Sequence, residues 1–163
     1  YNTNLKMNPP LRTAEDALAL QAAVADGTVD CIVTDHAPHA AHEKDCEWEI
    51  SYFGCIGLET SLPLMITNMV RTNKLSFTGL VRAMAVNPRR ILRLDPVKIA
   101  AGYKADLTLF DPEKKVQITT EYFESKSKNS AFIGAELYGV ATDVFVDGNR
   151  VLADEVVVPG GEK

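Results

Sequence analysis

The segment 30–39 constrains the fold of this chain more than any other; it reads DCIVTDHAPH. Its short apolar run is followed by a polar, proline-containing stretch, which is typical of a buried strand that ends at a loop. Asp35 would then lie at the carboxyl end of that strand, where parallel sheets and (β/α) barrels keep their chemistry. His39 follows across Pro38, which disfavours a helix between the two. We therefore expect a carboxylate and an imidazole close together, suited to metal binding, proton transfer or anion binding. The same pattern also fits a loop-capping aspartate beside surface histidines.

A helix precedes this strand. Thr13 is a good N-cap, with Asp16 at the capping-box position, and Asp26-Gly27 ends the helix. The order is thus a helix at about 14–25, a short turn and a strand at about 29–34. This α-then-β step is the unit from which parallel sheets and barrels are built.

Three more helices are predicted after the strand. They span about 58–72, about 77–86 with Ser76 as its cap, and a third helix that starts at Asn87-Pro88. We expect all three to pack outside the strand layer. The polar residues 40–52 before them are long enough to form a surface loop or a lid.

The chain changes character after residue 95. Alternating apolar residues predict strands at about 102–111 and 116–118, separated by a turn at Asp111-Pro112. An Asp-Gly pair at 147–148 predicts a tight hairpin. We therefore expect residues 1–95 and 96–163 to form two different units, the second a small β unit.

The β unit carries signs that further sequence is needed. A few short strands would need strands from elsewhere to cover their edges. The chain also lacks an initiating Met, so we expect a processed or partial product. The Ser- and Lys-rich residues 124–130 are expected to be exposed.

Composition narrows the classes of function. Of the 163 residues, 46% are hydrophobic and 24% are charged, as in globular proteins. The net charge of −5 argues against nucleic acid or an anionic membrane as the main partner. The apolar runs are too short to span a bilayer, and without a secretory segment a reducing cytoplasm is the expected location.

The cysteines and histidines allow one alternative. Cys31 lies in the predicted strand and fits a small core residue. A local zinc site, formed only by histidines and cysteines that lie close in sequence, is an alternative, although their spacing matches no standard zinc finger or zinc ribbon. The candidates for this site are His36, His39, His42, Cys46 and Cys55.

Three segments together resemble the class I dihydroorotases of the amidohydrolase superfamily. The segments are 6–12 (KMNPPLR), 34–39 (TDHAPH) and 53–60 (FGCIGLET). We call them the rim segments, because the resemblance implies that they lie at the mouth of a barrel. The tail at 102–111 resembles the β-sandwich half that amidohydrolases attach to their barrel. The resemblance implies an α/β fold in which 1–95 is the last part of a (β/α)8 barrel and 96–163 is part of a small β-sandwich. It also implies a zinc enzyme that interconverts N-carbamoyl-L-aspartate and L-dihydroorotate in pyrimidine synthesis.

The resemblance also assigns roles to individual residues. Asp35 would bind metal and act as the general acid and base. Asn8 and His39 would contact the substrate, and so would Phe53 and Gly54, largely through their backbone. Arg12 and Thr34 also match the motif, and we assign them packing or loop support. His36 matches too, but no catalytic role follows for it.

These residue types suit the reaction. Opening a cyclic amide needs a polarised carbonyl and a nucleophile near neutral pH. Zinc supplies the first by accepting the carbonyl oxygen and the second by lowering the pKa of bound water to about 7. A carboxylate can carry the proton to the departing nitrogen. An imidazolium or an amide can bind the substrate's carboxylate, which suits His39 and Asn8. We expect Asp35→Ala to abolish turnover and His39→Ala mainly to weaken substrate binding.

The chain also departs from the family pattern. It has no His-x-His pair, and it would supply one metal ligand where a catalytic zinc needs about three. We therefore expect this chain alone to be inactive and to need the N-terminal part of the barrel as a partner. A homodimer is also compatible with the sequence.

Two alternatives to a dihydroorotase stay open. One is another cyclic amidohydrolase, such as an allantoinase or dihydropyrimidinase, which the stretch 8–12 disfavours. The other is a silent scaffold subunit, which the presence of Asp35 and His39 disfavours.

Overall fold

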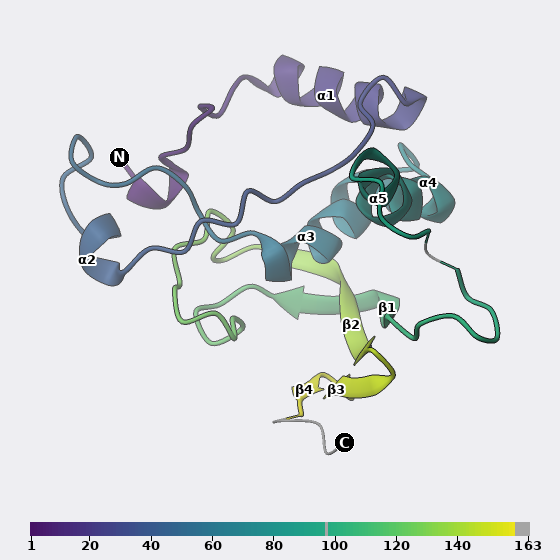
Figure 1. Ribbon diagram of the computed structural model, residues 1–163. Helices are drawn as coiled ribbons and strands as arrows, with labels where there is room; N and C mark the ends of the chain where they lie inside the picture. Colours follow the sequence, from purple (N-terminus) through teal and green to yellow (C-terminus); the bar gives the residue numbers. More distant parts are fainter. Residues whose placement is uncertain (97, 159–163) are drawn as a thin grey trace.

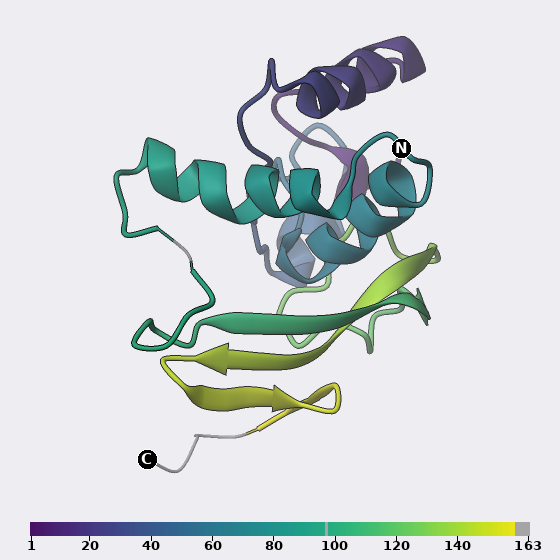
Figure 2. The same ribbon diagram turned by 90° about the vertical axis from the view of Figure 1, so that its right-hand side faces the viewer.

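The computed structural model describes residues 1–96 and 98–158, which form a mixed α/β structure in three layers. Helix α1 (Ala14–Asp26) lies on one side, a group of helices from residues 58–91 lies in the middle, and an antiparallel sheet lies on the other side (Figures 1 and 2). No helix in the described residues has the length and hydropathy needed to cross a bilayer.

Helix α1 begins and ends where the sequence predicts. The hydroxyl of Thr13 accepts from the backbone N–H of Asp16 at 3.3 Å, and the Asp16 carboxylate accepts from the backbone N–H of Thr13 at 3.2 Å. This capping box is therefore confirmed. Arg12 pairs with the same carboxylate at 3.6 Å. Leu18 and Leu20 are more than half exposed, so the described residues leave part of the apolar surface of α1 uncovered.

The strand predicted at 29–34 is not formed. The segment is extended, but no described strand pairs with it, and Val33 is 76% exposed. A strand needs a neighbour that accepts and donates its backbone hydrogen bonds. Here the backbone N–H of Ile32 bonds instead to the carbonyl of Ala83 at 3.0 Å. The prediction was wrong for this chain because the described residues hold no adjacent parallel strand.

The predicted helices are present, with two differences. The second and third join into one rod, because Asn87 keeps a right-handed helical backbone (φ −66°). Each of the two rods also contains a π-helical turn. The elements are η1 (Thr3–Leu5), α2 (Ala41–Lys44), α3 (Leu58–Met65), η2 (Ile66–Val70), α4 (Phe77–Val81), η3 (Arg82–Val86) and α5 (Asn87–Ile91). Helix α2 lies in the stretch predicted as a loop or lid.

The tail forms one antiparallel sheet with the strand order β1-β2-β3-β4. The strands are β1 (Leu107–Gln117), β2 (Glu136–Val146), β3 (Asn149–Ala153) and β4 (Val156–Val157). The hairpin turn at Asp147-Gly148 is confirmed. The turn predicted at Asp111-Pro112 is instead an irregularity within β1, where pairing with β2 shifts between Asp111 and Lys115. Proline cannot donate to the ladder, and the Asp111 carboxylate accepts from the backbone N–H of Glu113 at 2.9 Å.

Two apolar clusters join the helices to the sheet. Their buried members are Ile56, Ile118, Phe123 and Leu137 in one, and Ile66, Met69, Leu75 and Leu80 in the other. Strand β2 passes close to the helix layer at Gly139. A Cβ on Gly139 would lie 2.7 Å from Cγ1 of Ile66, which is fully buried. The division into 1–95 and 96–163 stays a prediction.

Candidate functional site

Hydrogen bonds tie the three rim segments together. The backbone N–H of Gly54 donates to the carbonyl of Lys6 at 2.8 Å, and that of Ala37 donates to the carbonyl of Cys55 at 2.9 Å. The ring of His39 bonds to the carbonyl of Phe53 at 2.9 Å. Three of the five predicted site residues, His39, Phe53 and Gly54, are thus brought together.

The His39 ring is fixed on three sides. Its Nε2 carries the hydrogen in the bond to Phe53, because a carbonyl oxygen can only accept. Its Nδ1 lies 3.5 Å from the carboxylate of Glu43, and its ring packs against that of Tyr52 in a tilted arrangement with centroids 5.4 Å apart. The imidazole is therefore held by contacts with the loop that carries Phe53 and Gly54 as well as by its own segment.

Asp35 lies on the same rim and is exposed. Its backbone is left-handed, with φ +44°, and its carboxylate has no hydrogen-bond or ion-pair partner in the described part of the chain. Burial raises the pKa of the Cys55 thiol, and the Asp35 carboxylate is close enough to raise it further. Asp35 is thus placed near the Cys55 thiol, and its carboxylate is left for a partner outside the described residues.

Asn8 is exposed and lies two residues after Lys6, before a cis peptide bond to Pro9. Within residues 1–96 and 98–158, no hydrogen bond joins the Asn8 side chain to His39 or Asp35. The structure therefore places the Asn8 segment at the rim through the backbone of Lys6, and the direction of the amide toward a ligand stays a prediction.

Gly54 has a backbone that other residues adopt only with strain, at φ +111°. A Cβ there would lie 2.6 Å from Cβ of Ala37 and 3.6 Å from Nε2 of His39. The absence of a side chain is what lets the loop approach the His39 segment this closely.

The local zinc site is not formed. His36 Nδ1 accepts from the backbone N–H groups of Gly57 (3.1 Å) and Leu58 (3.4 Å), so this ring caps helix α3. His42 is exposed on α2. Within the described residues, no group of three His, Cys, Asp or Glu side chains is arranged to hold a metal ion. The zinc alternative fails because helix capping and loop packing separate its candidates.

Two buried lysines, Lys6 and Lys44, hold the loop 45–55, and this role could not be predicted for either from the sequence. Lys6 is 7% exposed, and its ammonium donates to the carbonyls of Trp48 (2.6 Å), Glu49 (3.1 Å) and Ser51 (2.7 Å). Lys44 donates to the carbonyls of Tyr52 (2.8 Å) and Gly54 (3.0 Å), and burial lowers its pKa. The two ammonium groups therefore hold in place a loop that has little regular secondary structure.

Replacing Lys6 with methionine is expected to loosen residues 45–53. Methionine keeps the length of the side chain but leaves three carbonyls without a donor, at about 1–3 kcal/mol for each that stays buried. Hydrogen exchange of 45–53 should become faster. Lys126→Met, at an exposed lysine, is the matched control. Unchanged exchange in Lys6→Met would show that the loop is held by other contacts.

Cys55 is expected to be alkylated slowly at neutral pH. A raised pKa leaves less thiolate, which is the reactive form, so the rate should rise with pH only above the ordinary range of a cysteine. Iodoacetamide labelling followed by peptide mass spectrometry measures this, with a short unstructured cysteine peptide as the reference. Labelling at pH 7 as fast as the peptide would contradict the burial of the thiol.

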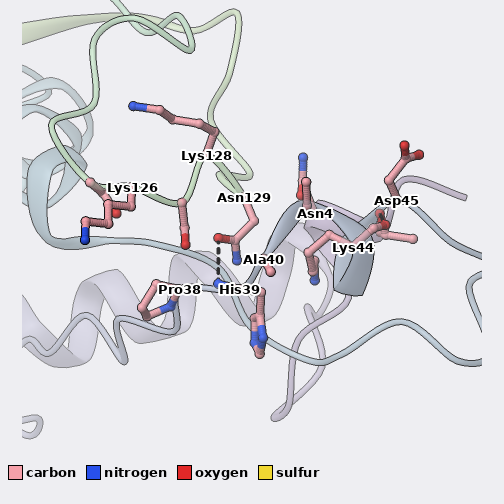
Figure 3. A pocket seen from close by; sticks show the side chains of 13 residues that line it. Asn4, Pro38, His39, Ala40, Lys44, Asp45, Lys126, Lys128 and Asn129 are labelled. Atoms are coloured by element: carbon pink, nitrogen blue, oxygen red, sulfur yellow. Dashed lines mark hydrogen bonds between the residues drawn. The ribbon is translucent and has the colours of Figure 1, made fainter.

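A cavity of about 810 Å³ opens beside His39, between the N-terminal turn, residues 38–45 and the loop at 125–129 (Figure 3). His39 lines it, whereas Asn8, Asp35, Phe53 and Gly54 do not. A second cavity of about 880 Å³ lies between α4, η3 and β1, away from all five. The predicted site residues therefore share a rim, and the described chain does not close a pocket over them.

The structure thus combines a mixed α/β fold with a rim that carries a carboxylate, an imidazole and backbone groups. The family model described as the amidohydrolase family matches residues 5–151. The chain belongs to the amidohydrolase family, and the resemblance carried by the rim segments is confirmed.

The most informative relatives are dihydroorotases. The dihydroorotase of Geotalea daltonii is 48% identical over 151 residues, which are 93% of this chain and 35% of that protein. The dihydroorotase of Clostridium acetobutylicum is 42% identical over 153 residues, 94% of this chain and 36% of that protein. This chain thus spans little more than a third of the length of these relatives.

Solved structures share the fold. The L-hydantoinase (dihydropyrimidinase) from Arthrobacter aurescens has a TM-score of 0.86 and 32% identity, covering 94% of this chain and 35% of its own. The inactive dihydroorotase-like domain of the Chaetomium thermophilum CAD-like multifunctional protein has a TM-score of 0.67 and 22% identity, covering 94% and 40%. The second likeness concerns the fold alone.

Proposed function

We propose that this chain is the C-terminal part of a dihydroorotase, which interconverts N-carbamoyl-L-aspartate and L-dihydroorotate in pyrimidine synthesis. Identity of 48% to a dihydroorotase supports the proposal. The observation that carries it is the linked rim, in which His39 bonds to Phe53 and Gly54 bonds to Lys6. Three segments distant in sequence thereby present their polar groups together.

The rest of the active site comes from outside this chain. We place residues 1–95 at the end of a (β/α)8 barrel and 96–163 in a β-sandwich, with the preceding barrel strands supplied by further polypeptide and the whole in the cytoplasm, as a homodimer or otherwise. The uncovered face of α1 and the unpaired segment 29–34 both fit such a neighbour.

The family implies zinc, and the described residues alone do not fit a zinc centre. They hold no three-ligand cluster, and catalytic zinc takes about three protein ligands. Asp35 is the candidate that this chain offers to a centre of one or two ions completed elsewhere, since its exposed carboxylate is unpaired within the described residues.

The remaining roles are those that the family resemblance implies, and the chemistry of these groups suits them. Asp35 carries a proton between the attacking water and the ring nitrogen. We assign Asn8 and His39 as donors to the substrate's carboxylate and the backbone of Phe53 and Gly54 as contacts of the ring, which requires the Nε2–H of His39 to exchange its bond to the Phe53 carbonyl for one to the substrate.

A second candidate is a hydantoinase or dihydropyrimidinase. The TM-score of 0.86 to the Arthrobacter aurescens enzyme favours it, because that structure shares the fold over 94% of this chain. The higher identity to dihydroorotases favours the first proposal.

A chimera tests the proposal. In it, this chain replaces the matching 151 residues of the Geotalea daltonii dihydroorotase. We expect turnover of L-dihydroorotate, with little activity on dihydrouracil, hydantoin or allantoin. A folded, metal-loaded chimera that prefers hydantoin or dihydrouracil would establish the second candidate. One that turns over none of them would leave a silent scaffold.

His39→Ala in this chimera is expected to raise KM for dihydroorotate about tenfold to a hundredfold with a smaller change in kcat, because a hydrogen bond to a charged group contributes about 1.5–3 kcal/mol. Steady-state kinetics measure both constants. The control is His42→Ala, which removes an exposed imidazole three residues further on. Equal kinetics in the two variants would exclude His39 from substrate binding.

A further inference from the structure

Asn129 is a buried amide that contacts two rim segments at once. It is 5% exposed and lies in the β1–β2 loop (residues 118–135). Its Oδ1 accepts from the backbone N–H of His39 at 3.2 Å. Its Nδ2 donates to the carbonyls of Ala37 at 3.0 Å and Gly54 at 3.3 Å.

The backbone of Asn129 adds a fourth bond, because its carbonyl accepts from the N–H of Ile56 at 3.0 Å. One residue of the tail thus bonds to Ala37 and His39 on one rim segment and to Gly54 and Ile56 on another. The amide spans the two segments and fixes their separation.

The loop around Asn129 is itself held in place. The carboxylate of Glu59 accepts from the backbone N–H groups of Glu124 at 2.7 Å and Ser125 at 3.2 Å. Figure 3 shows the Asn129 amide pointing at the His39 backbone, whereas the amino groups of Lys126 and Lys128 point away from it. The anchored loop therefore holds the Asn129 amide against the rim segments.

The chemistry of the amide matches these partners. An asparagine side chain both donates and accepts, and here it meets one donor and two acceptors in a buried place. Neither an aspartate nor a leucine could satisfy all three groups. An unpaired buried group is costly, so the rim would shift to find water or other partners if the amide were removed.

We propose that Asn129 is a positioning residue that holds the His39 and Gly54 segments in the arrangement that binds substrate. This rests on the proposed function. Asn129 acts through His39 and Gly54 and touches no reacting atom itself. Its loss therefore weakens the binding of substrate more than it slows the chemical step.

The test compares three variants in the chimera. Asn129→Ala removes all three side-chain bonds. Asn129→Asp keeps an acceptor for the His39 N–H and loses the donors to Ala37 and Gly54. Asn149→Ala removes an exposed asparagine in the β2–β3 turn and is the matched control. Kinetics on dihydroorotate and hydrogen exchange of 36–39 and 53–56 are measured for each.

We expect Asn129→Ala to raise KM about tenfold to a hundredfold, with kcat within about threefold, because a small displacement of binding groups has a large effect. Exchange should become faster in both segments. In Asn129→Asp it should become faster mainly in 53–56. The control should match the parent chimera in both measurements.

Two results would overturn the proposal. One is KM and exchange in Asn129→Ala equal to those of the Asn149→Ala control. The other is an equal loss of kcat and of thermal stability at unchanged KM, which would mark a structural role only. Hydrogen exchange needs no activity, so it decides whether Asn129 holds the two segments even if the parent chimera fails to turn over dihydroorotate and the proposed function falls.

Discussion

Replacing Asp35 with asparagine in the chimera is expected to lower kcat by about a hundredfold to ten-thousandfold, the range that general acid–base catalysis contributes. Asparagine keeps the size of the side chain and removes its ability to carry a proton at the pH of the assay. The effect on a bound metal is a second loss, since an amide is a weaker ligand than a carboxylate. Steady-state kinetics with metal analysis separate the two contributions.

Asparagine is a better probe here than alanine because of the backbone at this position. Asp35 has φ +44°, a left-handed conformation that Asn and Asp adopt more readily than alanine does. Asp147→Asn is a matched control, because Asp147 is also exposed and has φ +51°. It should leave both kcat and stability close to those of the parent. A near-normal rate in Asp35→Asn would refute the role assigned to this carboxylate.

Gly54→Ala is expected to destabilise the rim by about 3 kcal/mol and to raise KM for dihydroorotate by tenfold or more. The positive φ accounts for about 1–2 kcal/mol of this, and the overlap with Ala37 for about 1–3 kcal/mol. Thermal unfolding and steady-state kinetics of the chimera measure the two effects.

Gly134→Ala separates strain from overlap. Gly134 also has a positive φ, +92°, but a Cβ there meets nothing within 4 Å. It should therefore cost only the backbone strain, with KM unchanged. If both variants lose stability equally and keep KM, the close approach of Gly54 to the His39 segment has no part in binding.

Much of the helical and β structure could be predicted from short-range patterns. Thr13 and Ser76 cap their helices because an N-cap depends on a few neighbouring residues. The Asp147-Gly148 turn is local for the same reason. The strand at 29–34 could not be decided in this way, because its formation depends on a neighbouring strand and not on its own apolar residues.

The segments singled out from the sequence lie together in the structure, whereas the residues that support them could not be predicted. His39, Phe53 and Gly54 carry recognisable motif chemistry, and they do lie together. The expectation that 124–130 is exposed was wrong for Asn129 and Ser130, which are buried. A Ser- and Lys-rich composition reports the exposed side chains of a loop and cannot show which single amide turns inward across 90 residues of sequence.

The length of the β1–β2 loop is therefore constrained between two points that are fixed to the rest of the structure. The Glu59 carboxylate anchors the loop at Glu124 and Ser125, and Asn129 lies four residues further on. An insertion or deletion between these two anchor points would carry the amide past its partners, whereas the β2–β3 turn can vary in length without reaching the rim. Natural variants of this region should accordingly gather their gaps at the hairpin and spare the short span that ends at Asn129.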